Sequence, residues 1–193
     1  MRPVPSAIHF FRTTSLCLCL LIISGSIGWA REAALSGIVL TRTQEKLFIF
    51  TTIQYAFTEE MEAALKSGIP ASFLFFVRLK RDKRMWFDKT LVEKEETHTL
   101  TYDPLKGMYA VTRSWENESP FITASFKEAC DRMCKIEGLP LTRTDRLKKG
   151  TTYHVSAKAE LDKMNLPYYL HYVLFFVSCW DVETEWKTVY FTP

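Results

Sequence analysis

The sequence predicts a β-rich α+β fold: a single domain, mainly an antiparallel sheet or a β-sandwich, with about two short helices. Three observations predict this class. Several stretches alternate apolar and polar residues, which is the period of a half-buried strand. Turn residues separate neighbouring stretches at hairpin distance. Only two segments combine a helix cap with a helical apolar pattern.

The composition excludes several other classes of protein. The chain has 193 residues, of which 47% are hydrophobic and 14% aromatic, and a disordered chain has far fewer apolar residues. Lysine and arginine total 25 against 22 acidic residues, and Arg2 and Arg12 fall in a predicted export signal. The remainder is close to neutral, so we expect no nucleic-acid partner.

The first predicted elements are a hairpin and a helix. Residues 37–43 and 46–55 are rich in Ile, Val, Phe and Thr, which favours two strands. Thr58 precedes two glutamates and predicts a helix start, while Gly68 and Pro70 predict its end. The expected buried residues of this helix are Met61, Ala64 and Leu65.

Further strands and a second helix follow. Ser125 and Glu128 match a capping box and predict a helix over 126–136, with Gly138 and Pro140 stopping it. Residues 168–177 fit either a buried strand or a short helix. The remaining predicted strands are residues 71–81, 91–102, 108–114, 153–161 and 180–191.

Residues 1–30 have the three parts of a secretory signal. Basic residues come first, an apolar run follows over 16–23, and Gly28 and Ala30 precede an expected cleavage site. We therefore expect residues 31–193 to form the working domain in the periplasm or cell envelope. The alternative is a retained anchor, although the apolar run is shorter than the roughly 20 residues that span a bilayer.

A basic segment with a neighbouring tryptophan is a possible interaction surface. Cations could bind lipid phosphates while the ring lies at the membrane interface. The alternative is a solvated strand end and loop whose tryptophan folds back into the core. The residues of this surface are Arg78, Lys80, Arg81, Lys83, Arg84 and Trp86.

The predicted closing strand carries three carboxylates on one face, those of Asp181, Glu183 and Glu185. Three carboxylates could bind Ca²⁺, which prefers several oxygen ligands. Same-face neighbours on one strand are nearly 7 Å apart, so we favour a solvated acidic face and expect no metal or cofactor. Trp180 and Trp186 alternate with these acids and are expected to face inward.

The cysteines and histidines do not predict a catalytic site. Cys130 and Cys134 are one helical turn apart, too distant for a mutual disulfide, although Cys179 could bridge to either in an oxidising compartment. The three histidines outside the signal lie in separate elements, and the common hydrolase and nucleotide motifs are missing. We therefore expect a protein that is not an enzyme.

Three stretches resemble a bacterial family of exported proteins, domain of unknown function 4390. Residues 64–70 (Ala-Leu-Lys-Ser-Gly-Ile-Pro) are similar to its helix end and following strand. Residues 84–88 (Arg-Met-Trp-Phe-Asp) are similar to its basic, Trp-rich segment. Residues 166–167 (Leu-Pro) and 180–186, which begin and end in Trp, are similar to its closing pattern. The resemblance implies an exported protein and supplies no catalytic residues.

These observations predict a non-enzymatic binding or scaffolding module of the bacterial cell envelope. Its partner would be an envelope protein or a lipid surface. The alternative is a carrier or sensor of a small apolar ligand or lipid, suggested by the aromatic residues of 73–76 and 168–176. A hydrolase is a distant third. A large enclosed apolar cavity would favour the carrier, and a filled core with an exposed patch would favour the scaffold.

Overall fold

The computed structural model describes residues 33–82, 88–116, 119–162 and 182–193, and the statements below concern these residues. Their elements are β1 (Ala34–Leu35), β2 (Val39–Arg42), β3 (Lys46–Gln54), α2 (Glu59–Lys66), β4 (Ala71–Arg81), β5 (Lys89–Asp103), β6 (Met108–Arg113), β7 (Phe121–Thr123), α3 (Phe126–Met133), β8 (Lys135–Arg143), the 3₁₀ turn η1 (Thr144–Arg146), β9 (Tyr153–Leu161) and β10 (Lys187–Phe191).

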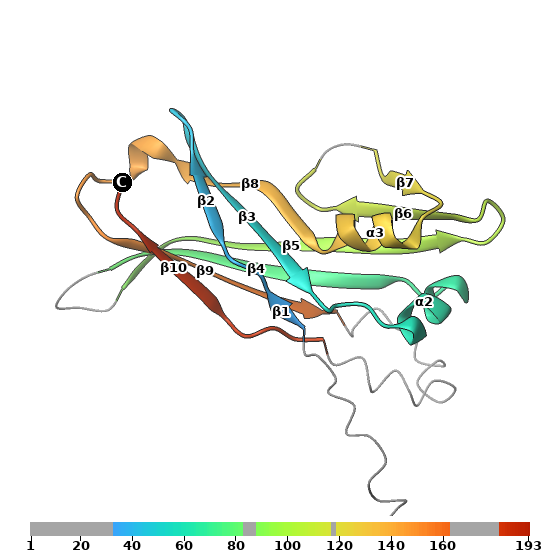
Figure 1. Cartoon of the computed structure of the whole chain (residues 1–193). Coiled ribbons are helices and arrows are strands. Elements are labelled where there is room, and N and C mark those ends of the chain that lie inside the picture. The colour runs from blue at the N-terminus through green and yellow to red at the C-terminus, as the bar shows by residue number, and fades with distance from the viewer. Residues whose placement is uncertain (1–32, 83–87, 117–118, 163–181) are drawn as a thin grey trace, which may run out of the picture. The chain divides into compact units, whose positions relative to one another are not determined.

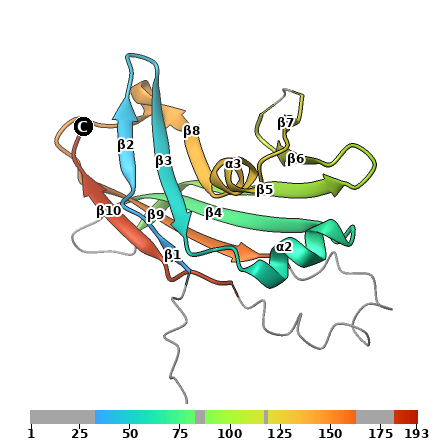
Figure 2. The same ribbon diagram turned by 45° about the vertical axis from the view of Figure 1, so that its right-hand side comes forward.

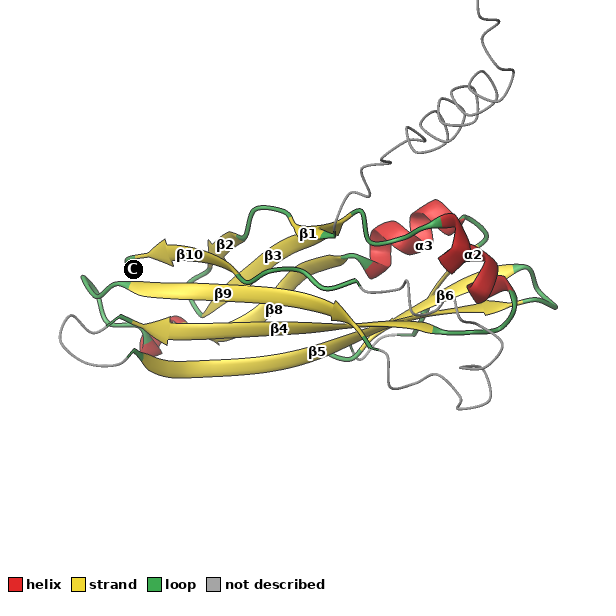
Figure 3. Cartoon of the chain, turned by 90° about the horizontal axis from the view of Figure 1, so that it is seen from below, coloured by secondary structure: helices red, strands yellow, loops and turns green. Residues whose placement is uncertain are grey.

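The strands form two antiparallel sheets (Figure 1). The larger sheet has six strands in the order β10-β9-β4-β5-β6-β7. In the smaller sheet, β3 pairs with β1, β2 and β8. The long strands β4 and β5 run side by side through the larger sheet (Figure 3). With two short helices, this arrangement confirms the β-rich α+β single-domain class.

One hydrophobic cluster joins the two sheets. Phe73 and Val155 of the larger sheet have no solvent-exposed surface, and neither do Ile49 and Leu139 of the smaller sheet. The alternation predicted from sequence is confirmed for the buried residues of β4 and β9, because successive residues of a strand point to opposite faces.

Helix α2 forms as the sequence predicts. The hydroxyl oxygen of Thr58 accepts a hydrogen bond from the Met61 N–H at 3.4 Å, and Met61, Ala64 and Leu65 are buried. Gly68 follows the helix at φ +88°, a left-handed conformation that costs a residue with a side chain about 1–2 kcal/mol.

Helix α3 is shorter than predicted. The capping box is confirmed at its start, where the Glu128 N–H donates to Ser125 Oγ at 3.3 Å. The helix then ends at Met133, with Cys134 as its cap, and packs beside β5, β6 and β7 (Figure 2). The prediction that it continues to residue 136 was wrong, because Lys135 already begins β8.

Strand β8 was misread because it contains two residues that usually end regular structure. Gly138 lies at φ +79°, where the register of β8 against β3 shifts. A second register shift lies next to Pro140. A bulge accommodates an extra residue in one strand, and both Gly and Pro are tolerated at such positions. The residues that predicted a stop therefore mark bulges within a strand.

Candidate functional site

The face of the six-stranded sheet that points away from the hydrophobic cluster is the candidate interaction surface, and we call it the outer face. On β4, buried Val77 and Leu79 alternate with Phe76, Arg78 and Lys80, which are only partly buried. The latter three therefore lie on the outer face. Arg81, the last residue of β4, lies in the opposite phase.

Cross-strand register assembles the outer face from segments far apart in the sequence. Arg78 lies opposite Ser156 of β9, and Ser156 lies opposite Thr188 of β10. Directly opposed residues of antiparallel strands share a face. The hydroxyl groups of Ser156 and Thr188 are 2.8 Å apart and share a hydrogen bond, so this row is continuous across three strands.

Arg78 is held on the outer face by two neighbours. Its Nε donates to Glu93 Oε1 of β5 at 2.7 Å. Its guanidinium carbon lies 4.5 Å from the centre of the Trp186 ring. Each exposed contact of this kind contributes at most about 1 kcal/mol to stability. Together they fix the orientation of the guanidinium.

Trp186 does not face the core, contrary to the sequence prediction. Its exposed fraction is 41%. Glu183 pairs with Glu160 of β9, and Lys187 pairs with Ala157 of the same strand. Lys187 comes four residues after Glu183, whereas Ala157 is only three residues from Glu160. One extra residue is therefore inserted between them, and an insertion of one residue moves the following side chains to the other face.

A second row continues the outer face. Lys80 lies opposite His154, which lies opposite Tyr190. The ring centres of His154 and Tyr190 are 5.3 Å apart, and His154 Nε2 is 3.8 Å from Asp88 Oδ2. Tyr190 is 66% exposed. The outer face thus presents two large aromatic side chains, Trp186 and Tyr190, beside an oriented arginine.

The predicted basic segment is only partly described. Arg78 and Lys80 are on the outer face, and Arg81 is half-buried in the opposite phase at the strand end. Three other residues of this prediction lie outside the described residues: Lys83, Arg84 and Trp86. The described cations therefore do not form one uniformly basic patch.

The predicted acidic face is also divided. Glu183 Oε1 lies 2.5 Å from Lys158 Nζ, which also pairs with Glu160 at 3.1 Å. Hydrogen bonds to Glu183 and Glu160 raise the pKa of Lys158 above its usual value. Glu185 lines a separate groove beside β1, and Asp181 lies outside the described residues. Glu183 is thus held in an ion pair with Lys158, which it shares with Glu160.

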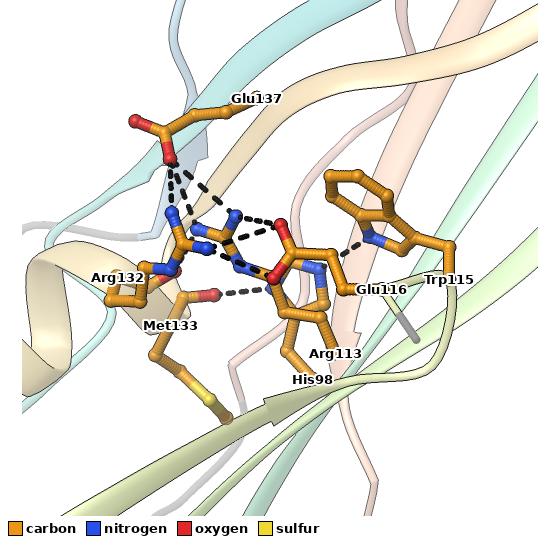
Figure 4. Close-up of polar contacts among 7 residues, drawn as sticks. All are labelled: His98, Arg113, Trp115, Glu116, Arg132, Met133 and Glu137. Atoms are coloured by element: carbon orange, nitrogen blue, oxygen red, sulfur yellow. Dashed lines mark hydrogen bonds and ion pairs between the residues drawn. The ribbon is translucent and has the colours of Figure 1, made fainter. Parts of the chain in front are cut away.

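His98 belongs to a different polar cluster, on the core side of β5 (Figure 4). Trp115 Nε1, which can only donate, bonds to His98 Nε2 at 3.2 Å. The proton of neutral His98 is therefore on Nδ1, which donates to the Met133 carbonyl oxygen at 2.7 Å. Burial lowers the pKa of His98 to about 4. With both nitrogens engaged, His98 has no free position for proton transfer to a substrate.

Arg113 is the central cation of the same cluster, and its side chain is 1% exposed. It donates to Glu116 Oε1 at 2.9 Å, to the Arg132 carbonyl oxygen at 2.6 Å and to Glu137 Oε2 at 3.4 Å. Arg132 bonds to the same two carboxylates, at 2.8 and 2.9 Å (Figure 4). The four charges balance one another.

This cluster caps the C-terminal end of α3. The last carbonyl groups of a helix have no partner within the helix. Arg113 of β6 bonds to the carbonyl of Arg132, and His98 of β5 bonds to that of Met133. The cluster therefore joins α3 to the six-stranded sheet, and its role is structural.

A concave site of the described surface lies where β3 ends against α3. This pocket has a volume of about 440 Å³, within the range of small-ligand sites. It is lined by Cys130 and Asp131 of α3, by the cap residue Cys134, and by Tyr55 from the chain after β3. Both cysteines are free thiols, so the bridge from Cys179 considered from the sequence is not formed at either position. Tyr55 has φ +59°, which is uncommon for a residue with a side chain. We call this site the β3–α3 pocket.

Sequence reasoning found Arg78 but missed the residues that complete its site. Glu93 and Tyr190 lie on strands whose register with β4 and β9 no local pattern specifies. Alternation alone could have placed Glu93 on one face of its strand. The capping cluster draws on β5, β6, α3 and β8, so no spacing in the sequence indicates it.

The described parts of the chain contain neither a cluster of three metal-ligating side chains nor a helix that could span a membrane. Within these ranges, no three His, Cys, Asp or Glu side chains come together as a metal site. Likewise, the helices described there are all too short or too polar to cross a bilayer. His98 and His154 lie on opposite faces of the sheet, and His171 lies outside the described residues.

Comparison with known proteins identifies the family but no similar characterised protein. Neither curated proteins nor solved structures give a match. A family model described as a domain of unknown function, DUF4390, matches residues 30–190. This match covers most of the chain and includes all three stretches in which the sequence resembles that family. The chain therefore belongs to the DUF4390 family.

Proposed function

We propose that this protein is an exported, non-enzymatic binding module of the bacterial cell envelope, and that its outer face binds a partner protein. The observation that carries the proposal is the arrangement of Arg78 between Glu93 and Trp186, with Tyr190 exposed nearby. Trp, Tyr and Arg are enriched among the residues that dominate the binding energy of protein interfaces. Trp and Tyr bury large areas with few rotatable bonds, and the guanidinium of Arg78 is already oriented by its neighbours.

The charge of this face favours a protein over a lipid surface. Arg78 and Lys158 are each paired with glutamates, so an anionic headgroup would have to compete with carboxylates already in place. A protein partner instead buries the aromatic rings and leaves these ion pairs at the rim.

The packing of the core favours a binding surface over a carrier of small apolar ligands. Phe73, Phe75 and Leu79 of β4 are at most 1% exposed and belong to one continuous cluster. The aromatic residues of 168–176, which also suggested a carrier, lie outside the described residues. The carrier remains the alternative function.

Export is a separate part of the proposal. It is supported by the order of basic residues, apolar run and small residues in 1–30. N-terminal sequencing of the protein recovered from envelope fractions should begin at Arg31. Recovery of the intact N-terminus from the cytoplasm would contradict export.

Site-specific photocrosslinking tests the binding surface. A photoreactive amino acid replaces Tyr190 in one full-length variant and Leu105 in the other. Leu105 is the control because it is 97% exposed in the turn between β5 and β6. After irradiation of the producing cells, we expect a discrete adduct of protein mass from position 190 only.

Three results would contradict this account of the outer face. One is the same adducts from both positions, and another is no adduct from position 190. The third is binding of the purified chain to anionic vesicles that is lost on Trp186→Ala, because a lipid surface would then occupy this face.

A further inference from the structure

The larger sheet ends at β10, and this edge of the sheet is open. Strand β10 pairs with β9 on one side and with no other strand of the described residues. Residues 188–191 (Thr-Val-Tyr-Phe) are types that favour strands, and none is a charge or a proline, which commonly protect an edge. The charge of Lys187, at the start of β10, is engaged by the Leu35 carbonyl at 3.2 Å.

The opposite edge of the same sheet is much less suited to pairing. It is formed by β7, which has only three residues, and a very short edge strand limits the hydrogen bonds that another chain can make. Of the two edges of the larger sheet, β10 is therefore the one that can accept a further strand.

Hydrogen bonds of β9 show which of its main-chain groups point toward β10. The Leu161 N–H donates to the Val182 carbonyl at 2.8 Å, and the Thr184 N–H donates to the Ala159 carbonyl at 2.9 Å. The N–H and C=O groups of alternate residues in a strand point to the same side. The register of β9 against β4 runs without a shift, so the main-chain groups of Val155 also point toward β10.

The same phase directs the main-chain groups of two β10 residues to the open edge. Val155 lies directly opposite Val189, and opposed residues whose groups point at each other exchange both N–H···O bonds. Val189 is therefore bonded to β9. Thr188 and Tyr190 alternate with Val189, so their N–H and C=O groups point away from β9. An extended segment beside β10 can bond to all four of these groups.

The open edge adjoins the two aromatic residues of the outer face. Tyr190 is 66% exposed and Trp186 is 41% exposed. A groove of about 380 Å³ also adjoins the start of β10, lined by residues 33–35 (Ala-Ala-Leu) and 185–187 (Glu-Trp-Lys). Its lining is mostly apolar and carries one charge of each sign. Alternate side chains of an added strand would meet the aromatic rings and this groove, which favours a mainly apolar segment.

We propose that the partner of the outer face binds by strand addition, with an extended, mainly apolar segment of that protein paired to β10 as a seventh strand of the larger sheet. This inference rests on the proposed binding function and specifies how the partner is held. In this mode of recognition, main-chain hydrogen bonds supply affinity and the alternate side chains of the added strand supply specificity.

Proline substitution tests strand addition without removing an aromatic ring. Thr188→Pro removes an N–H that points to the open edge, and an edge strand tolerates proline at such a position. Val189→Pro removes an N–H that bonds to β9. Thermal unfolding should therefore show a small decrease in Tm for Thr188→Pro and a much larger one for Val189→Pro. Equal decreases would overturn the assigned phase, and the proposal with it.

The binding test uses the photoreactive residue at position 190 as its probe. Thr188→Ala is the matched control, because it loses the hydroxyl bond to Ser156 and keeps the main-chain N–H. We expect the discrete adduct from Thr188→Ala and roughly tenfold less of it from Thr188→Pro, since main-chain bonds supply the affinity. In the purified adduct, the Thr188 N–H should exchange with solvent roughly a hundredfold more slowly than in the free chain.

The outcomes separate strand addition from the proposed function. Equal adduct yields from Thr188→Pro and Thr188→Ala, or unchanged exchange of the Thr188 N–H in the adduct, would overturn strand addition and leave the outer face as the binding surface. An adduct of twice the chain's mass would also overturn it, because β10 would then pair with a second copy. If position 190 gives no adduct in the otherwise unchanged chain, the proposed function fails and this inference fails with it.

Discussion

The indole N–H of Trp115 donates to Nε2 of His98 across 3.2 Å, and this bond determines which His98 nitrogen carries the proton. A second proton on the ring would place two N–H groups against each other. Neutral His98 is thus part of the capping of α3, which makes the stability of the fold dependent on pH.

Stability should fall as the pH falls from about 6.5 to about 4. In the folded protein burial lowers the pKa of His98 to about 4, from 6.5 in the unfolded chain. Between these values the unfolded state binds the proton more tightly, so acid favours unfolding. The expected loss is roughly 3 kcal/mol. Urea unfolding of wild type and His98→Gln from pH 7.5 to pH 4 measures it. An equal pH slope in both proteins would contradict this role of His98.

Arg113→Met should destabilise the protein by about 3–5 kcal/mol, the usual cost of removing one partner from a buried ion pair. The variant leaves the carbonyl of Arg132 without this donor, and Glu116 keeps only its ion pair with Arg132. The control is Arg143→Met, because Arg143 is 66% exposed and its ion pair is with Asp145, which is also exposed. Its expected loss is about 0–1 kcal/mol. Equal denaturation midpoints for the two variants would show that the cluster does not cap α3.

Gly68→Val should cost roughly 1–2 kcal/mol, since valine is penalised in the left-handed conformation. Gly37→Val is the matched control, because Gly37 lies outside that region and has open space around it. Thermal unfolding should show a lower Tm for the first variant only. A normal Tm for Gly68→Val would mean that the end of α2 does not need the left-handed residue.

Trp186→Ala should leave stability within about 1 kcal/mol of wild type, because the contact that it removes is an exposed one. Phe75→Ala, on the buried face of β4, should cost about 3–5 kcal/mol. Chemical denaturation of both variants measures the difference. If Trp186→Ala were as unstable as Phe75→Ala, the extra residue before β10 would be misplaced.

The sequence predicts elements whose signals are local. The cap at Thr58 and the alternation of Phe73, Phe75 and Val77 each depend on residues within one element, and the structure confirms both. Gly138 fails as a stop signal because the same residue suits a helix end and a bulge. The pairing of β8 with β3 is what makes Gly138 a bulge and not the end of a helix.

The outer face could not be predicted because it depends on register between distant strands. Regular alternation from the buried Thr184 would place Trp186 in the core. One inserted residue between 183 and 187 breaks this alternation, and Trp186 therefore lies on the outer face. Likewise, Arg78 meets Glu93 and Trp186 only because β5 and β10 flank β4 and β9 in the sheet. Such pairings follow from the whole topology, which a local pattern does not specify.

The affinity of the partner captured at position 190 tests the central claim most directly. Purified full-length wild type, Trp186→Ala, Tyr190→Ala and Leu105→Ala are each titrated with that partner. If the outer face is the binding surface, Trp186→Ala and Tyr190→Ala should each raise the Kd about 30-fold or more, the effect of a residue that dominates an interface. Leu105→Ala should match wild type. Unchanged affinity in both aromatic variants, with intact folds, would contradict the assignment of this face.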